Sequence, residues 1–140
     1  MTNATHILVI EDDPADRGLI AELLTLRGRG RIRTIEASTF EAALEHLSAQ
    51  PFDLVLLDTR LPDATALYAL RAIDERAPMT PVLPHTSYIT VKARQWARER
   101  GAFDVVVRGE LNPLWSAVNK LLTLRALGQD ERELPRAVGE

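Results

Sequence analysis

Short apolar runs alternate with longer amphipathic segments along the whole chain. Two of the runs are almost continuously apolar, which is typical of strands buried on both faces of a parallel sheet by covering helices. The pattern therefore predicts a layered α/β arrangement. The five predicted strands are Ile7–Ile10, Ile32–Ala37, Phe52–Leu57, Val82–Leu83 and Phe103–Val107.

Between these runs, apolar residues recur at helical spacing. In Phe40–Leu47 they occupy positions i, i+3, i+4 and i+7, which places them on one face of a helix. The segment Thr90–Arg100 has a weaker stripe and many arginines, so we expect its helix to be the least well packed. Clearer stripes lie in Leu19–Leu24, Leu67–Ile73 and Leu114–Arg125.

Glycine and proline residues fall at the expected boundaries of these elements. Asp13 followed by Pro14 is typical of a helix N-cap and first helical position. Gly28 and Gly30 should end the first helix and Gly101 the fourth. After Leu127 the pattern gives way to charged residues, so we expect one domain over residues 1–127 and a frayed tail over 128–140.

Five strand–helix units in strict alternation predict an α/β fold with a parallel sheet and right-handed crossovers. In such sheets, ligands bind beyond the carboxyl ends of the strands, at the point where the strand order reverses. The residues that directly follow each apolar run are therefore the candidates for chemistry.

Composition narrows the class of protein. The chain has 140 residues, 46% apolar and 26% charged, which suits one globular domain. A net charge of -3 argues against broad, sequence-independent nucleic-acid binding. The absence of cysteine excludes disulfides and thiol chemistry. With a short polar N-terminus and no apolar run near the roughly 18 residues that span a bilayer, we expect a cytoplasmic protein.

Several polar residues follow the predicted strands and should meet at one edge of the sheet. Glu11–Asp13 follow the first strand, Asp58 the third, Thr86–Ser87 the fourth and Arg108 the fifth. Crowded carboxylates repel unless a cation joins them, and oxygen ligands of this kind suit Mg²⁺. A carboxylate can also form an aspartyl phosphate, whose oxygens a hydroxyl and a guanidinium would hold.

Each of these residues also has an ordinary interpretation. An acidic pair such as Asp12 and Asp13 often only caps a helix, Thr86 alone indicates a strand residue, and Arg108 alone indicates a solvated charge. Their coincidence at one edge, in the order that one site requires, favours a functional site.

The segments Ile7–Asp13 and Phe52–Asp58 resemble the opening and the phosphorylation segment of response-regulator receiver domains in bacterial two-component systems. Leu61–Asp63, Thr86–Ser87 and Gly101–Ala102 with Arg108 extend the resemblance, which runs from about His6 to Leu127. It implies a doubly wound, five-stranded flavodoxin-like (βα)5 fold with strand order 2-1-3-4-5.

The resemblance also implies roles for individual residues. Asp58 would be the phosphoacceptor, with Thr86 and Arg108 contacting the phosphoryl group. Magnesium would be bound directly by Asp13 and Asp58, through water by Asp12, and by the backbone carbonyl of Arg60. The partners would be a sensor histidine kinase or a histidine phosphotransfer protein.

Four positions depart from the family pattern. Arg108 replaces the usual lysine, and the two cations hold phosphate differently. Gly109 replaces a proline that follows a cis bond, so we expect a trans bond and a looser loop. Val105 stands where many members carry an aromatic switch residue. Pro84 lacks an N–H for the sheet, so we expect a short or bulged strand, in which His85 is either an ordinary strand-end residue or a sensor of phosphate or pH.

The leading hypothesis is a stand-alone receiver that signals through protein contacts and contacts neither nucleic acid nor membrane. The alternative is a degenerate receiver that binds its partner with little phosphorylation-dependent switching. A third class, a phosphatase of the aspartyl-phosphate type, is disfavoured because Arg60 stands where such enzymes place a second carboxylate.

The output surface should be formed by the fourth helix, the fifth strand and the fifth helix, where a homodimer could form. Trp96, Arg98, Val105 and Trp115 would contribute to it. Trp115 is equally well interpreted as closing the edge of the core.

Overall fold

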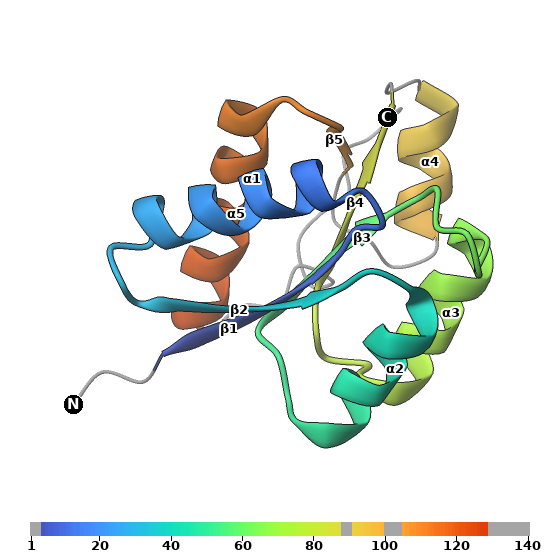
Figure 1. Ribbon diagram of the computed structural model, residues 1–140, viewed down its shortest axis with the longest axis horizontal. Coiled ribbons are helices and arrows are strands. Elements are labelled where there is room, and N and C mark those ends of the chain that lie inside the picture. Colours follow the sequence, from blue (N-terminus) through green and yellow to red (C-terminus); the bar gives the residue numbers. More distant parts are fainter. Residues whose placement is uncertain (1–3, 88–90, 100–104, 129–140) are drawn as a thin grey trace.

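A five-stranded parallel sheet forms the middle layer of the protein in its computed structural model (Figure 1). The strand order is β2-β1-β3-β4-β5, which confirms the predicted fold class and strand order. The structure describes residues 4–87, 91–99 and 105–128, apart from the side chains of residues 92, 93 and 96.

Strands and helices alternate throughout, as the sequence predicts. The strands are β1 (Thr5–Ile10), β2 (Ile32–Ala37), β3 (Leu54–Asp58), β4 (Val82–Thr86) and β5 (Val106–Val107). The helices are α1 (Pro14–Arg27), α2 (Phe40–Ala49), α3 (Ala66–Arg76), α4 (Val91–Glu99) and α5 (Leu111–Ala126). No helix in the described ranges is long and apolar enough to cross a membrane.

Successive residues of the strands face opposite sides of the sheet, so each strand contributes to two cores. One core joins the sheet to α1 and α5, which lie together on one side in Figure 1. Its sheet residues include Ile7, Val9, Leu54, Leu56 and Leu83. The other core joins the sheet to α2 and α3 and includes Leu8, Ile10, Val55 and Leu57.

Most predicted boundaries agree with the structure to within two residues. Asp13 is the N-cap of α1, Pro14 is its first residue and Gly28 is its C-cap. The third strand begins at Leu54 instead of Phe52, although Phe52 is still buried. The predicted cap at Gly101, the start of the fifth strand and the tail beyond residue 128 lie outside the described residues.

The expectation for Pro84 was wrong, because β4 is as long as β3 and keeps an unbroken register with it. The carbonyls of Pro81 and His85 accept hydrogen bonds from β3, whereas the carbonyl of Thr86 accepts one from Arg108, just after β5. Alternate residues of a parallel strand bond to opposite neighbours, so Pro84 turns its nitrogen toward β5. In the described residues β5 pairs with β4 only from His85 onward, and the missing N–H therefore costs β4 nothing.

The turn between α1 and β2 gives a stability prediction. A Cβ atom on Gly28 would lie 2.7 Å from the carbonyl oxygen of Leu24 and 2.6 Å from Ile32. Gly28→Ala should therefore lower the free energy of unfolding by about 1–3 kcal/mol. The matched control is Gly18→Ala inside α1, where nothing lies within 4 Å. It should raise the free energy by about 0.5–1 kcal/mol, since glycine weakens a helix.

Urea denaturation of the two variants and the wild type would measure both effects. Equal stability of Gly28→Ala and the wild type would show that the turn has room for a side chain.

Candidate functional site

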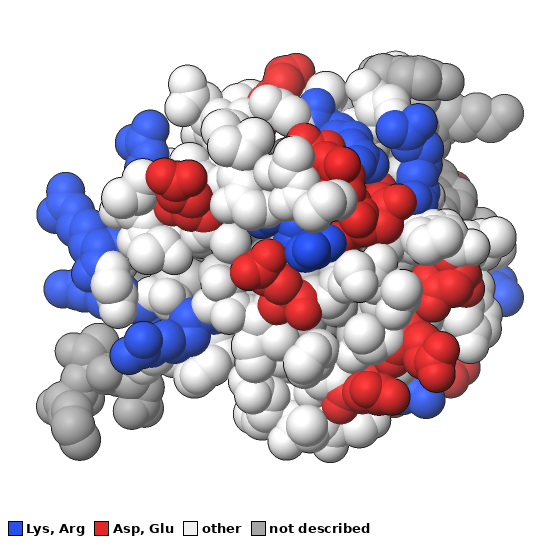
Figure 2. All heavy atoms as spheres, viewed as in Figure 1, with Lys and Arg blue, Asp and Glu red and all other residues white. Residues whose placement is uncertain are grey.

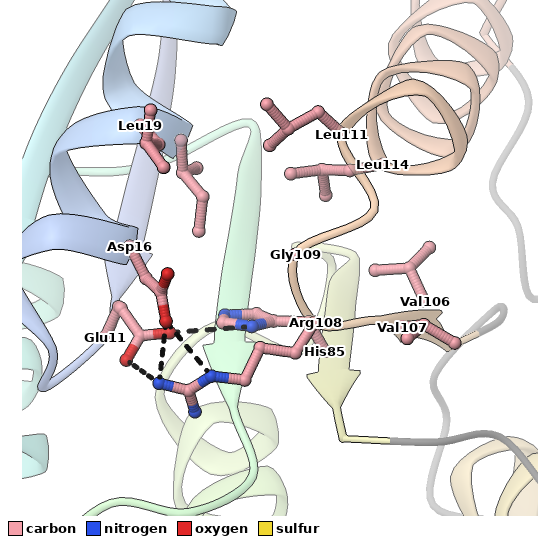
Figure 3. Close-up of a pocket in the computed structure, with 11 residues that line it drawn as sticks. Glu11, Asp16, Leu19, His85, Val106, Val107, Arg108, Gly109, Leu111 and Leu114 are labelled. Atoms are coloured by element: carbon pink, nitrogen blue, oxygen red, sulfur yellow. Dashed lines mark hydrogen bonds and ion pairs between the residues drawn. The ribbon is translucent and has the colours of Figure 1, made fainter.

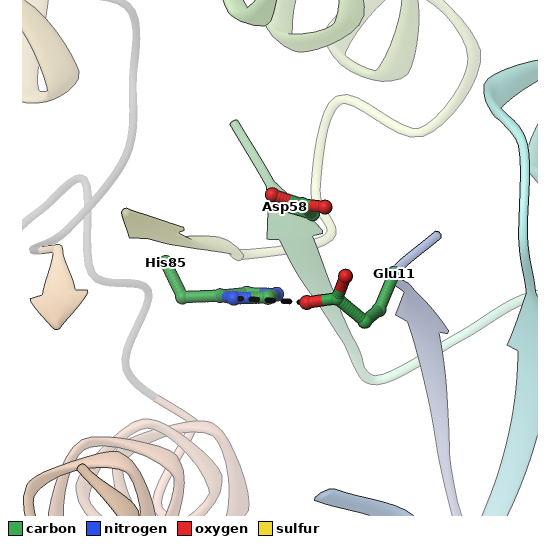
Figure 4. A group of neighbouring side chains, drawn as sticks. All are labelled: Glu11, Asp58 and His85. Atoms are coloured by element: carbon green, nitrogen blue, oxygen red, sulfur yellow. Dashed lines mark ion pairs between the residues drawn. The ribbon is translucent and has the colours of Figure 1, made fainter. Parts of the chain in front are cut away.

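A row of three buried polar side chains crosses the carboxyl ends of β1, β3 and β4. Glu11 follows β1, Asp58 ends β3 and His85 lies in β4 (Figure 4). Their exposed fractions are 0%, 1% and 2%. Asp58 pairs with His85 in the register, and Glu11 lies one residue beyond the pair of Ile10 with Leu57. The row is therefore the polar continuation of the α1/α5 core.

Arg108 reaches this row from the segment after β5 (Figure 3). Its Nη1 donates to Asp58 Oδ1 at 3.0 Å and its Nη2 donates to Glu11 Oε2 at 2.8 Å. Nη2 and Nε also donate to Asp16 Oδ2 on α1, at 3.1 and 3.3 Å. One guanidinium thus joins three carboxylates from different elements, which buried carboxylates need to offset their loss of hydration.

Backbone geometry explains how Arg108 arrives there. Val106 pairs with His85, so Arg108, two residues on, leaves the same face of the sheet. The N–H of Arg108 donates to the carbonyl of Thr86 at 2.6 Å. Gly109 then turns the chain toward α5 with a φ of 88°, a conformation that proline cannot adopt. The described peptide bonds include no cis bond, which confirms the trans bond expected at Gly109.

Asp58 is held as an anion. Burial acts to raise the pKa of Asp58, but the opposing interactions outweigh it and the pKa is lowered. They are the Arg60 N–H, which donates to Oδ1 at 2.9 Å, hydrogen bonds with Asp12 and Glu11, and the charge of Arg108. A carboxylate that is ionised at neutral pH can act as a nucleophile.

Glu11 and His85 are both neutral at pH 7. Burial raises the pKa of Glu11 to about 8, although the N–H of Asp13 donates to its Oε2 at 3.0 Å. Burial lowers the pKa of His85 to about 4. The 3.7 Å separation between His85 Nδ1 and Glu11 Oε1 is therefore not an ion pair at this pH.

Each member of the row has one buried polar atom without a hydrogen-bond partner. In the described part of the chain these atoms are Glu11 Oε1, Asp58 Oδ2 and His85 Nε2. Arg108 contacts only one oxygen of each carboxylate, which leaves the other oxygen free. Unpaired buried acceptors are costly, and a cation between them would satisfy them. The donor set therefore fits a divalent cation.

The fold and this site agree with a comparison to protein families. Residues 7–118 match the response regulator receiver domain family. The chain belongs to this family. Response regulator protein PilR of Pseudomonas aeruginosa is 36% identical over 135 residues, which cover 95% of this chain and 30% of that protein. Regulatory protein AtoC of Escherichia coli is 29% identical, over 99% of this chain and 30% of its own length. The receiver thus spans less than a third of these relatives.

Solved structures have the same fold. NtrX from Brucella abortus aligns with a TM-score of 0.79 and 25% identity, over 89% of the receiver and 28% of the NtrX chain. A CheY-like receiver domain protein from Methanospirillum hungatei aligns with a TM-score of 0.77 and 21% identity, over 89% of the receiver and 98% of that chain. At this identity the second likeness concerns the fold alone.

The receiver structure brings some of the predicted site residues together and uses others differently. Asp58, Arg108 and the backbone of Arg60 meet, and Asp12 is hydrogen-bonded to Asp58. The carboxylate of Asp13 instead accepts from the N–H of Asp16, at 2.9 Å, as the cap of α1. Its role as a direct magnesium ligand remains a prediction.

Thr86 is half-buried at the end of β4. Because strand residues alternate, its side chain leaves the face opposite to His85. Its contact with a phosphoryl group also remains a prediction.

Sequence reasoning missed Glu11 and His85 as members of the site. The signal was present in the alternation of the strands. Counting back in twos from Asp58 gives Leu56 and Leu54, and counting back from Glu11 gives Val9 and Ile7, all of them buried. The same-face positions at the carboxyl ends are therefore Glu11, Asp58 and His85, but this needs the register between strands.

The pKa of Glu11 gives a prediction on stability. In buffer with a chelator, the free energy of unfolding should fall as the pH rises from 6.5 to 8. Folded Glu11 keeps a proton up to a pKa of about 8, whereas unfolded Glu11, with its ordinary value of 4.5, has already lost it. The slope is at most about 1.4 kcal/mol per pH unit. His85 acts in the opposite sense, but only between about 4 and 6.5.

Glu11→Gln cannot titrate, so its stability should be nearly constant across this window. Urea denaturation of both proteins at the two ends of the window would measure the difference. The same slope in the variant and the wild type would contradict a protonated Glu11.

Proposed function

We propose that this receiver accepts a phosphoryl group on Asp58 and transmits the signal through contacts with other proteins. The observation that carries the proposal is the buried, ionised Asp58 at the end of β3, bonded to Arg108. Family membership supports a phosphoacceptor, and a sensor histidine kinase or histidine phosphotransfer protein as the donor.

The transfer uses groups of this chain in defined ways. An oxygen of Asp58 forms a bond to phosphorus, and the bond from phosphorus to the donor's nitrogen or oxygen breaks. The electron pair of that bond leaves with the donor. Asp58 is only 1% exposed and Arg108 lies on its Oδ1, so Arg108 must move aside and can then bond the phosphoryl oxygens. The Arg60 N–H keeps the carboxylate oriented.

A divalent cation at this edge would be held by Glu11 and Asp58, with Asp12 and the backbone carbonyl of Arg60 nearby in sequence. The family resemblance implies Mg²⁺. Such a cation would neutralise charge on the transferring phosphoryl group. The buried pair of free oxygens on Glu11 and Asp58 supports this assignment.

The proposed output surface needs revision from the sequence-based expectation. Val105 is only 4% exposed. Trp115 is half-buried against the α1/α5 core and lines a groove with Arg27 and Ile32, on the α1 side of α5. Neither residue is an exposed anchor on the α4-β5-α5 face. A homodimer through that face remains a proposal that depends on other residues of α4 and α5.

Labelling tests the phosphoacceptor. Acetyl phosphate with Mg²⁺ should add the mass of one phosphoryl group to the wild type and none to Asp58→Asn. The matched control is Asp53→Asn, which lies before the opposite end of β3 and should label like the wild type. Intact-protein mass spectrometry measures all three. Equal labelling of Asp58→Asn and the wild type would refute Asp58 as the acceptor.

The alternative, a degenerate receiver, is favoured by one observation. Arg108 is tied to three carboxylates, more than a switch that has to exchange partners readily would need. Sedimentation with and without beryllofluoride, a phosphoryl mimic, separates the two. We expect the mimic to change the association state of the wild type and not that of Asp58→Asn. An unchanged wild type that still labels on Asp58 would favour the degenerate receiver.

A further inference from the structure

The three buried polar atoms without partners belong to one group of potential metal ligands. Among the described residues, Glu11, Asp58 and His85 are the group in which one ligand atom from each lies within 4.8 Å of the others. Figure 4 shows the three side chains converging from β1, β3 and β4. One of the three donors is an imidazole nitrogen, which magnesium does not favour and transition metals do.

We propose that Glu11, Asp58 and His85 form a site for a divalent transition-metal ion, such as Mn²⁺, Co²⁺ or Zn²⁺, that this receiver prefers to Mg²⁺. The inference deepens the proposed function, because it names the cation of the same site and assigns His85 as a ligand.

The charges at the site support a divalent ion. Arg108 bonds to three carboxylates, those of Glu11, Asp16 and Asp58. Three negative charges and one guanidinium leave two negative charges in a region where Glu11 and Asp58 are buried. A divalent ion would cancel them. Because Arg108 uses Oε2 of Glu11 and Oδ1 of Asp58, the ion would take the remaining oxygens without displacing it.

The dimensions are close to those of a bound ion. With bonds of about 2.1 Å, two ligand atoms on one ion lie at most about 4.2 Å apart. The group therefore needs to contract by less than about 1 Å. A pocket of about 50 Å³ lies against Glu11, His85 and Arg108 (Figure 3). A water molecule takes roughly 30 Å³, so this pocket has room for a water ligand.

Cobalt absorption gives a direct readout of the site. Titration of the wild type with Co²⁺ should produce visible bands, and a large excess of Mg²⁺ should not abolish them. His85→Gln should weaken Co²⁺ and Zn²⁺ by at least about tenfold, the lower end of what is lost on altering a metal site. Its affinity for Mg²⁺ should stay nearly constant. The matched control is His46→Gln on α2, which should bind like the wild type.

A second measurement needs no variant. Zn²⁺ should shift the ring ¹⁵N resonances of His85 in the wild type and leave those of His46 unchanged. Unshifted His85 resonances, or equal Co²⁺ affinity in His85→Gln and the wild type, would overturn the proposal. Asp58 labelling with Mg²⁺ would then still stand. His85-dependent Co²⁺ binding without labelling of Asp58 would keep the metal site and refute the phosphoacceptor.

Discussion

The contact between Arg108 and three carboxylates determines how the carboxyl edge of the sheet is arranged. Glu11 and Asp58 are fully buried there, and removing one partner from such a cluster costs about 3–5 kcal/mol. Arg108 satisfies one oxygen of each and extends to Asp16 on α1. The guanidinium thereby joins the ends of β1 and β3 to the segment after β5, which pairs with β4 over only two residues. Acidic and basic side chains also lie side by side on the face seen in Figure 2.

This cluster is possible because the two faces of the sheet are apolar up to its last rung. Each strand delivers apolar residues at alternate positions to the α1/α5 core and then one polar residue at its carboxyl end. The polar row is therefore screened from water by the core beneath it and by Arg108 above it. That screening raises the pKa of Glu11 to about 8 and lowers that of His85 to about 4, so burial and charge compensation set the chemistry together.

The departures from the family pattern are mutually compatible. Gly109 has the left-handed backbone that carries the chain from Arg108 into α5. Pro84 turns its nitrogen toward β5, where pairing in the described residues starts only at His85. His85 occupies a position next to Asp58 in which an apolar residue would leave no nitrogen donor. These residues share one neighbourhood, which is consistent with a site adjusted as a unit.

The sequence by itself determined the α/β class, the alternation of elements and the helix caps, because hydrophobic period and capping chemistry are local properties. The Asp13 cap and the positions of Asp58 and Arg108 at strand ends followed from them. The strand order 2-1-3-4-5 came from resemblance. Only the tertiary structure decided that Glu11 and His85 flank Asp58, because this depends on the register between strands distant in sequence. It also decided the fate of Asp13, whose carboxylate could serve either a helix or a cation until the backbone fixed its partner.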